Sequence, residues 1–326
     1  MAAASWYAAV PNWSKPMRSY LKNGIGLVPC EVWEPGCWVN VIEPDNSDKK
    51  FVLETLGIPE SFYDDIEDVD ERPRIEVDDG WCFVLMRIPS KESDAHASAP
   101  YSTIPFGVIF KDDVFVTVCF YDNDMIPDFV QHTRRKNIHH DDNINFIFRL
   151  LLSSSVWFLK YLKQINIQTK VTERLLERSV RNEELQDLQR MDKSLLFFTS
   201  SLRGNELVVH RLKNLRSVKE IYDVELVEDV EIESKQALET TNIYSEVING
   251  MQDTYTSVIS NNLNLVMKRL TTINVVLMVP TLIASFFGMN LELNTTIFNW
   301  TFLIVILVSL ALIAVTTIVF FKKKWF

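Results

Sequence analysis

Hydrophobic and polar positions follow different patterns along the chain and divide it into regions. The run 81–88 (WCFVLMRI) is almost continuously apolar, which is typical of a strand buried on both faces. The segments 107–110 and 114–120 are also apolar and flank a polar Lys-Asp-Asp turn, which predicts two further strands. The acidic segment 59–70 indicates a short helix, and the polar segment 93–105 contains two prolines and indicates a loop. We therefore predict an α/β domain in the N-terminal part of the chain.

The next region, from 142 to 270, has the pattern of long helices. It contains no proline, its only glycines are Gly204 and Gly250, and Leu, Ile and Val recur at helical spacing. We expect a turn between helices near the Arg-Gly-Asn sequence at 203–205. The highly charged segment 171–190 indicates a solvent-exposed helix that returns along its neighbour.

A heptad stripe marks the last of these helices, and its six members lie at seven-residue steps: Val230, Ala237, Tyr244, Met251, Val258 and Leu265. Such a stripe indicates a helix packed in a supercoiled bundle. The helical pattern continues without a break into the apolar run that follows. Pro280 lies inside that run, and membrane helices tolerate proline. A helix over 226–287 would be about 93 Å long and would form a stalk that enters the membrane.

Two apolar segments near the C-terminus predict a transmembrane hairpin. Residues 271–287 contain no charge over 17 positions, and 297–321 contain none over 25, about 37 Å as a helix. Lys268 and Arg269 precede the first segment and three lysines follow the second, whereas the short connection has no basic residue. By the positive-inside rule, both termini lie in the cytoplasm of a multi-pass protein of the cell (inner) membrane. Two buried helices of a soluble protein are the alternative.

These patterns give a set of predicted boundaries. They are a cytosolic α/β domain at 1–145, a cytosolic helical region at 146–225, a long stalk helix at 226–287 that includes the first transmembrane helix at 271–287, an extracytoplasmic loop at 288–296, a second transmembrane helix at 297–321 and a basic cytosolic tail at 322–326. We expect no signal peptide, because the first residues lack a basic segment followed by an apolar one.

Charge and cysteine content narrow the classes of function. The 326 residues carry a net charge of −10, and the part outside the membrane region is still more acidic. Such a surface argues against nucleic acid as a partner and is compatible with divalent cations, although acidity also serves solubility. The four cysteines form no C-x-x-C pair and are expected to be reduced thiols of a cytosolic domain. The chain has no Gly-rich phosphate loop and neither a G-x-S-x-G nor an H-E-x-x-H motif, so we expect neither an enzyme nor a small-molecule substrate.

A polar stripe runs along the first transmembrane segment at steps of 3, 4, 3, 4 and 3 residues: Thr271, Asn274, Met278, Thr281, Ser285 and Gly288. Asn264 and Met267 extend it towards the cytosol. A stripe of this kind can line an axial pore built from several subunits, or it can form a contact between helices, where small and polar residues also gather. The second segment is almost wholly aliphatic between 303 and 315, which suits a lipid-facing position.

The sequence Phe-Gly-Met-Asn at 287–290, directly after the first of two C-terminal spans, resembles the Tyr-Gly-Met-Asn motif of the CorA family of Mg²⁺ transporters. The segment 266–271 that leads into the span and the basic, aromatic-ended tail 322–326 also resemble that family. The resemblance implies an α+β membrane protein that assembles in the lipid bilayer as a funnel-shaped homopentamer, with first spans around a Mg²⁺ pore and second spans outside them.

On this resemblance, Gly288, Met289 and Asn290 form the ion entrance, where a ring of Asn290 carbonyl oxygens binds the hydrated ion through its waters. A simple helix C-cap is the alternative role for Asn290. The positions that carry over as pore-lining are Asn264, Met267, Leu270, Thr271, Met278, Thr281 and Ser285. Of these, Met267, Leu270 and Met278 would form a hydrophobic constriction that closes by dewetting. Asn274 occupies a position that is often small or apolar in related pores.

The resemblance also implies a regulatory Mg²⁺ site between neighbouring cytosolic domains. Asp229 lies at the matching position of the stalk helix. Its partner carboxylate belongs to the α/β domain, and the candidates are Asp64, Asp65, Glu67 and Asp68. Each is alternatively a solvated surface acid. Bound Mg²⁺ would hold the closed state, and its loss would let acidic interfaces separate.

Two departures from the family pattern affect the choice of ion. Phe287 replaces the usual tyrosine, and the loop after Asn290 contains a single acid, Glu292, as a candidate for attracting cations. The same fold transporting Co²⁺, Ni²⁺ or Zn²⁺ is the nearest alternative, although the five histidines lie outside the membrane region. A membrane-tethered coiled-coil scaffold without transport is the alternative from a different class.

Overall fold

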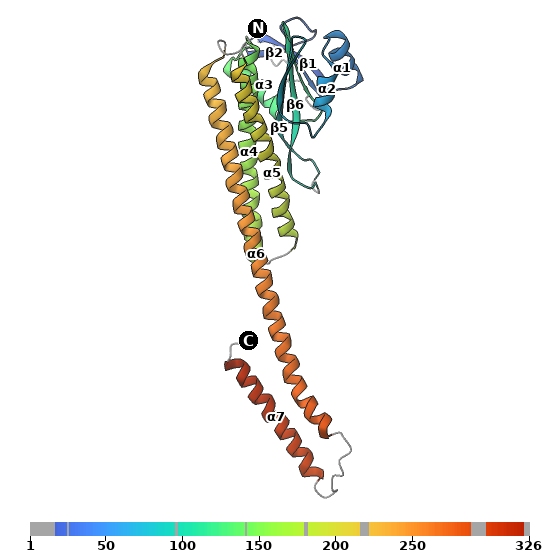
Figure 1. Ribbon diagram of the computed structural model, residues 1–326, viewed down its shortest axis with the longest axis vertical. Helices are drawn as coiled ribbons and strands as arrows, with labels where there is room; N and C mark the ends of the chain where they lie inside the picture. Colours follow the sequence, from blue (N-terminus) through green and yellow to red (C-terminus); the bar gives the residue numbers. More distant parts are fainter. Residues whose placement is uncertain are drawn as a thin grey trace, which may run out of the picture. The chain divides into compact units, whose positions relative to one another are not determined.

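The computed structural model describes residues 17–24, 26–94, 97–140, 142–178, 182–215, 222–287 and 298–322. The chain divides into two compact units, Met1–Gly250 and Met251–Phe326, and each is described by itself (Figure 1). The first unit is an α/β domain with long helices, and the second consists of helical segments with few charges.

A seven-stranded sheet organises the first unit, in the order β2-β1-β3-β7-β6-β5-β4. The strands are β1 (Met17–Gly24), β2 (Gly26–Cys30), β3 (Trp38–Ile42), β4 (Arg74–Asp78), β5 (Trp81–Lys91), β6 (Tyr101–Lys111) and β7 (Val114–Cys119). Strands β3 and β7 pair in parallel, and the other neighbours pair antiparallel. A sheet of mixed direction fits an α/β domain that also contains hairpins.

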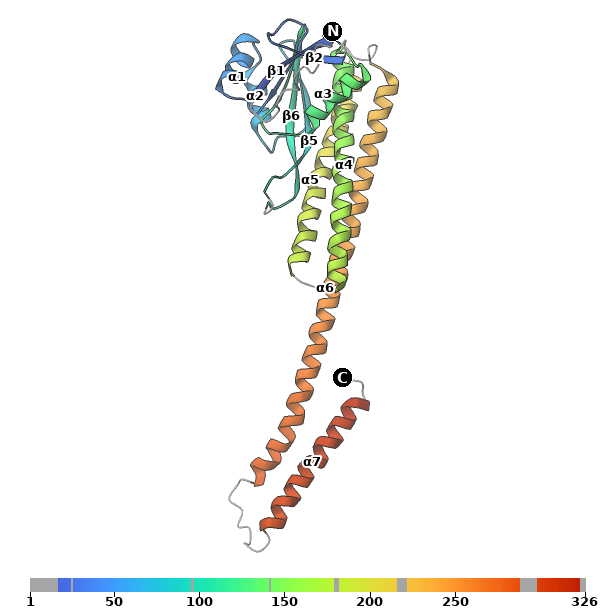
Figure 2. The ribbon, with the colours of Figure 1, turned by 180° about the vertical axis from the view of Figure 1, so that it is seen from behind.

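Strand β5 is buried on both faces, as its continuous apolar run predicts. Val84, Met86 and Ile88 belong to one hydrophobic cluster, whereas Phe83 and Leu85 belong to the other. Helices therefore cover the sheet on both sides. On one side lie α1 (Asn46–Lys50), a π-helical turn (Phe51–Thr55) and α2 (Glu60–Glu67), and on the other lie α3 (Met125–Lys136), α4 (Asn143–Arg178), α5 (Asn182–Asn214) and the start of α6 (Val224–Phe287), as Figures 1 and 2 show.

The predicted loop over 93–105 is wrong in its second half, because β6 begins at Tyr101. Pro105 lies inside this strand, opposite Arg87 of β5. The β6–β7 pairing begins only at Gly107 and Val118, so no strand partner requires the N–H that Pro105 lacks. The proline is thus compatible with a strand interior at this one position.

The turn predicted at 203–205 is also wrong, because α5 passes through it as a continuous helix. A Cβ atom on Gly204 would lie 2.6 Å from Cγ of Pro73, so the glycine allows α5 to approach the sheet closely. Helix α4 ends at Arg178, inside the segment 171–190 that we expected to form one exposed helix, and α5 begins at Asn182.

Helix α6 contains 64 residues, and Pro280 lies within it. In the first unit its buried face includes Val230 and Ala237 of the heptad stripe. A second buried row, also at seven-residue steps, consists of Val227, Ser234, Thr241 and Ile248. Apolar residues alone do not reveal this row, because Ser234 and Thr241 are polar; Thr241 satisfies its hydroxyl by donating to the carbonyl of Ala237 at 2.7 Å.

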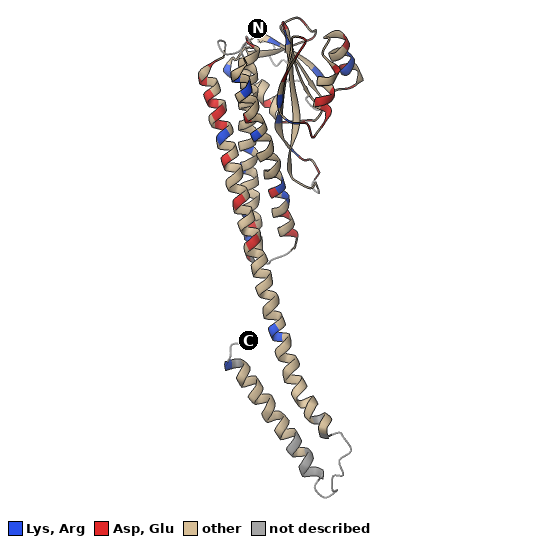
Figure 3. Cartoon of the chain, viewed as in Figure 1, with Lys and Arg blue, Asp and Glu red and all other residues tan. Residues whose placement is uncertain are grey.

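The second unit contains the rest of α6 and α7 (Phe298–Lys322). Within the described part of the chain, one helix is long and apolar enough to cross a membrane, namely Val224–Ile283 of α6, and α7 has a shorter apolar stretch, Ile306–Phe320. Figure 3 shows acidic residues along the first part of α6 and few charges in the second unit. The heptad residues of this unit, Val258 and Leu265, are exposed in the single chain, so their apolar surface is unpartnered there.

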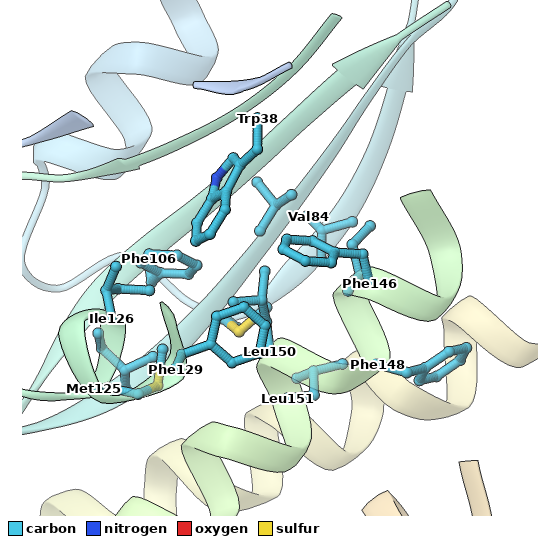
Figure 4. Packing of buried hydrophobic residues seen from close by; sticks show 14 of the residues in the cluster. Trp38, Val84, Phe106, Met125, Ile126, Phe129, Phe146, Phe148, Leu150 and Leu151 are labelled. Atoms are coloured by element: carbon cyan, nitrogen blue, oxygen red, sulfur yellow. The ribbon is translucent and has the colours of Figure 1, made fainter. Parts of the chain in front are cut away.

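Aromatic rings fill the core between the sheet and helices α3 and α4. The Trp38 ring lies 5.9 Å from that of Phe129 and 5.1 Å from that of Phe146, both in edge-on contacts (Figure 4). Its indole nitrogen donates to Thr117 Oγ1 at 2.8 Å, and Thr117 in turn donates to Asn40 Oδ1 at 2.9 Å. Burial of this tryptophan therefore leaves its N–H satisfied.

Candidate ion pathway

The second half of α6 presents the predicted polar stripe on an exposed face. All eight described pore-lining candidates, which are the seven described stripe residues and Leu270, are exposed in the single chain: Asn264, Met267, Leu270, Thr271, Asn274, Met278, Thr281 and Ser285. In contrast, Thr272 is buried and Val276 and Val279 are half-buried on another face of the helix. The exposed surface also includes the apolar residues Leu277 and Leu282, which flank the polar stripe on either side.

The hydroxyl groups of the stripe threonines form hydrogen bonds within α6. Thr271 Oγ1 donates to the carbonyl of Met267 at 2.8 Å, and Thr281 Oγ1 donates to that of Leu277 at 2.8 Å. A hydroxyl bonded to the preceding turn keeps its oxygen available as an acceptor. These positions can therefore offer oxygen atoms along the stripe without an unpaired donor.

The predicted entrance lies outside the described residues. Helix α6 is described as far as Phe287, and Gly288, Met289, Asn290 and Glu292 all fall within 288–297. The entrance role and the C-cap alternative for Asn290 both stay predictions.

Asp229 of α6 borders a cavity of about 340 Å³ in the first unit. The cavity is also lined by Glu233 of the same helix and by Asp128 and His132 of α3. Asp128 is occupied by other partners, because it accepts from Lys160 Nζ at 2.7 Å and from Trp157 Nε1 at 3.1 Å. Sequence reasoning missed these neighbours, since Asp128 and Asp229 are 101 positions apart and only the fold brings them to one cavity.

The other acidic candidates lie on the opposite side of the sheet, around α2. Asp64 forms an ion pair with Lys49 at 3.5 Å, and Asp65 forms one with Arg74. Partial burial raises the pKa of the Asp65 carboxyl, and the charge of Arg74 opposes that shift. Asp68 is exposed and accepts from the backbone N–H of Asp70 at 2.9 Å.

These acids do not meet Asp229 within one chain, because α2 packs against one hydrophobic cluster and the start of α6 packs against the other. Among the described residues, no group of three or more His, Cys, Asp or Glu side chains is placed to hold a metal ion. A regulatory site that uses Asp229 together with Asp64, Asp65, Glu67 or Asp68 therefore requires a second subunit.

Acidic residues are concentrated on the first turns of α6, as Figure 3 shows. They are Glu225, Glu228, Asp229, Glu231 and Glu233. Of these, Glu231 is paired with Lys213 of α5 at 2.7 Å. The unpaired majority makes this part of the helix a region of negative potential that attracts cations.

Comparison with known proteins identifies the family of this chain. The family model described as "CorA-like Mg2+ transporter protein" matches residues 33–323. The chain belongs to the CorA family. The resemblance predicted from the sequence around 287–290 is thereby confirmed at the level of the family, whose members are transporters and not enzymes.

Two curated CorA proteins are similar over most of their length. The cobalt/magnesium transport protein CorA of Thermotoga maritima is 25% identical over 301 residues, which cover 88% of this chain and 82% of that protein. The cobalt/magnesium transport protein CorA of Methanocaldococcus jannaschii is 23% identical over 298 residues, which cover 88% of this chain and 90% of that protein.

The fold is that of a solved CorA structure. The complete structure of the CorA magnesium transporter from Methanocaldococcus jannaschii has a TM-score of 0.80 and 21% identity, and the match covers 96% of this chain and 99% of that one. The α/β domain and the long helix α6 both fall within this similarity.

Proposed function

We propose that this protein is a channel for Mg²⁺, formed by five copies of the chain around a pore that the second half of α6 lines. The observation that carries the proposal is the polar stripe from Asn264 to Ser285, which lies exposed on an otherwise apolar helix of a CorA-family chain. A polar row at hydrocarbon depth is costly unless it faces water or another polar surface. A pore shared by several subunits supplies such a surface.

Assembly follows from the same helix. The heptad residues Val258 and Leu265 are exposed in one chain, and equivalent helices of other copies would cover them in a supercoiled bundle. The pore would be closed by rings of Met267, Leu270 and Met278, which exclude water where they meet. The second span, at 297–321, would lie between the pore helices and lipid.

The topology that we propose places both termini on the cytoplasmic side of the cell (inner) membrane. Lys268 and Arg269 lie at the start of the first apolar stretch, and Lys322 lies at the end of α7. The connection 288–296 contains no Lys or Arg, which favours its location outside. Gly288, Met289 and Asn290 then form the outer mouth, and Glu292 is the single acid beside it.

Regulation by cytosolic Mg²⁺ would use Asp229 of one subunit and an acid near α2 of its neighbour. Glu67 and Asp68 are the strongest of the four candidates, because both are exposed, whereas Asp64 and Asp65 already pair with Lys49 and Arg74. Mg²⁺ between two carboxylates would neutralise them and hold adjacent subunits together. Loss of the ion would leave like charges facing each other and favour the open state.

Flux through proteoliposomes tests the function. Purified protein is reconstituted around a Mg²⁺-sensitive dye, and Mg²⁺ entry is compared for wild type, Asn290→Ala and the matched loop variant Asn294→Ala. We expect Asn290→Ala to abolish entry while the oligomer survives, and Asn294→Ala to conduct like wild type. Equal flux through all three would contradict the channel and favour the scaffold.

The identity of the ion is a separate question that the same liposomes answer. The similar proteins are named for both cobalt and magnesium, so Co²⁺ is the first competitor to test, followed by Ni²⁺ and Zn²⁺. Stripe residues provide amide, hydroxyl and thioether groups but no His or Cys, which favours a hard cation. We expect Mg²⁺ to compete most effectively at equal free concentration.

A further inference from the structure

One polar side chain of the membrane region differs from all the threonines around it. Thr271, Thr272 and Thr281 of α6 each donate to a carbonyl one turn earlier in their own helix. Thr316 and Thr317 of α7 do the same. Asn274 is exposed and has no hydrogen-bond partner within the described part of the chain.

An unpaired carboxamide is expensive at this depth. The Asn274 side chain has two N–H donors and one carbonyl acceptor, and a helix backbone offers it no free partner. Transfer of such a group from water to hydrocarbon is strongly unfavourable when it forms no hydrogen bonds. The position therefore requires water, an ion or a second subunit next to it.

The neighbours of Asn274 on the helix indicate whether its side chain faces lipid or an aqueous pathway. Asn274 lies three residues after Thr271 and four before Met278, so it is in phase with the exposed polar stripe. It lies about 6 Å along the helix from both Leu270 and Met278, which present apolar groups on that same face. A row of this kind places one carboxamide between two hydrophobic positions.

We propose that Asn274 forms an internal binding site for a hydrated divalent cation, made of one side-chain carbonyl oxygen from each subunit. This inference rests on the proposed function, because the ring exists only if α6 lines a pore. Mg²⁺ gives up its water reluctantly, so neutral amide oxygens bind it through retained waters and release it again. The N–H groups bond water or the amide of the adjacent subunit.

Such a site gives the ion an intermediate stopping point between the hydrophobic rings of Leu270 and Met278. Without Asn274, an ion that crosses both rings would pass a region whose one polar stripe residue is Thr271, next to Leu270. A polar ring between them divides the barrier into two shorter ones. Asn274 would thus determine how fast and how selectively hydrated ions pass the narrow part of the pore.

The experiment compares full-length wild type, Asn274→Leu, Asn274→Asp and the matched off-stripe variant Val276→Leu in proteoliposomes. Mg²⁺ entry is measured over a range of Mg²⁺ concentrations, with and without Co²⁺ as competitor. We expect Asn274→Leu to lower the maximal flux by about tenfold, and Asn274→Asp to lower the half-saturating Mg²⁺ concentration by about tenfold because charged oxygens hold the cation more tightly. Val276→Leu should behave like wild type.

A purely structural role for Asn274, as a hydrogen bond between helices, predicts a different result. Oligomers of Asn274→Leu would dissociate more easily in detergent, while the half-saturating Mg²⁺ concentration of Asn274→Asp would stay at the wild-type value. That pattern would overturn the inference. Wild-type kinetics in both variants would overturn it as well.

A cysteine variant keeps the test decisive if Asn274→Leu does not assemble. Asn274→Cys should be blocked by Cd²⁺ added at low concentration, because thiolates lining a pore bind this soft ion. Val276→Cys contains the same native thiols and should stay open, so it serves as the control. Absence of block in Asn274→Cys would contradict a position in the pathway.

The outcomes separate this inference from the proposed function. One outcome contradicts the internal site alone: wild type conducts Mg²⁺, Asn290→Ala does not conduct it, and the Asn274 variants behave like wild type. If wild type admits no Mg²⁺, or Asn290→Ala conducts normally, the channel itself is wrong.

Discussion

The carboxamide of Asn205 on α5 takes the place of a neighbouring strand beside Arg87 of β5. Its Oδ1 accepts from the Arg87 backbone N–H at 2.9 Å, and its Nδ2 donates to the Arg87 carbonyl at 2.7 Å. Strand β4 pairs with β5 only as far as Leu85, and on the other side Arg87 faces Pro105, which has no N–H. Without Asn205 the backbone N–H of Arg87 would be unpaired, and its carbonyl would keep only the hydrogen bond that Ser154 Oγ donates at 3.4 Å.

We expect Asn205→Leu to destabilise the first unit by about 1–3 kcal/mol, because it leaves the part-buried N–H of Arg87 without a partner. Thermal unfolding of the detergent-solubilised chain, followed by circular dichroism, measures the change. Glu206→Leu is the matched control, since Glu206 is the exposed next residue on the same helix. Equal unfolding temperatures for the two variants would contradict the role of Asn205.

Two cysteine thiols, one half-buried (Cys82) and one buried (Cys119), predict how the reactivity and stability of the protein change at alkaline pH. Desolvation raises the pKa of Cys82 to about 11 and that of Cys119 to about 12. The thiolate is the reactive form, so iodoacetamide at pH 8 should modify these residues slowly in the folded chain and rapidly in guanidinium. Mass spectrometry of the alkylated chain checks this, and equal rates in the two conditions would show that both thiols are accessible.

The same shifts determine the sign of the stability change. Unfolded cysteine loses its proton at a pKa of about 8.5, below the folded values, so the folded state holds protons that the unfolded state has released. The thiols' contribution to stability is fully present below that unfolded pKa. It is lost as the pH rises through the window up to the folded values, and denaturant midpoints measured from pH 8 to 11 should fall accordingly.

Orientation in the membrane can be measured with single cysteines. We expect Thr295→Cys, in the connection between the two predicted spans, to react with a membrane-impermeant maleimide on intact cells, because the proposed topology places this connection outside. Glu239→Cys, on α6 of the first unit, should react only after the cells are permeabilised. The reverse labelling pattern would contradict the positive-inside assignment.

Removal of the Asp229 charge should weaken feedback by Mg²⁺. We expect Asp229→Asn to raise the internal Mg²⁺ concentration that halves flux by about tenfold, since the proposed regulatory pair then loses one carboxylate. Glu239→Gln is the control, because Glu239 lies on the same helix and is exposed. The measurement is Mg²⁺ flux into liposomes loaded with graded internal Mg²⁺ concentrations. The same half-inhibiting Mg²⁺ concentration for Asp229→Asn and Glu239→Gln would show that Asp229 has no regulatory role.

The predictions that succeeded rely on local patterns. An eight-residue apolar run identified β5, because a strand covered on both faces has few polar positions. A heptad without proline indicated the long helix that the structure describes as α6. The motif at 287–290 pointed to the CorA family, which the family model confirms. Each of these signals lies within neighbouring residues, where sequence periodicity and side-chain direction are directly linked.

The predictions that failed depend on contacts between distant segments. Gly204 and Asn205 resemble a turn in sequence, yet they allow a helix to pack closely against Pro73 and to complete β5. Pro105 resembles a loop residue, yet it occupies a strand where its missing N–H has no partner to lose. In each case the residue type was interpreted through its usual local role, while tertiary packing required a different one.

The sequence by itself determined the class of this protein: an acidic α/β domain, a long heptad helix and apolar C-terminal segments with a family motif. Hydrophobic periodicity records which face of an element is buried, so these features are readable from the chain alone. Only the tertiary structure decided which charges are already paired, such as Asp64 with Lys49, and which polar groups are not, such as Asn274. Pairing depends on distances between residues remote in sequence, which no local pattern encodes.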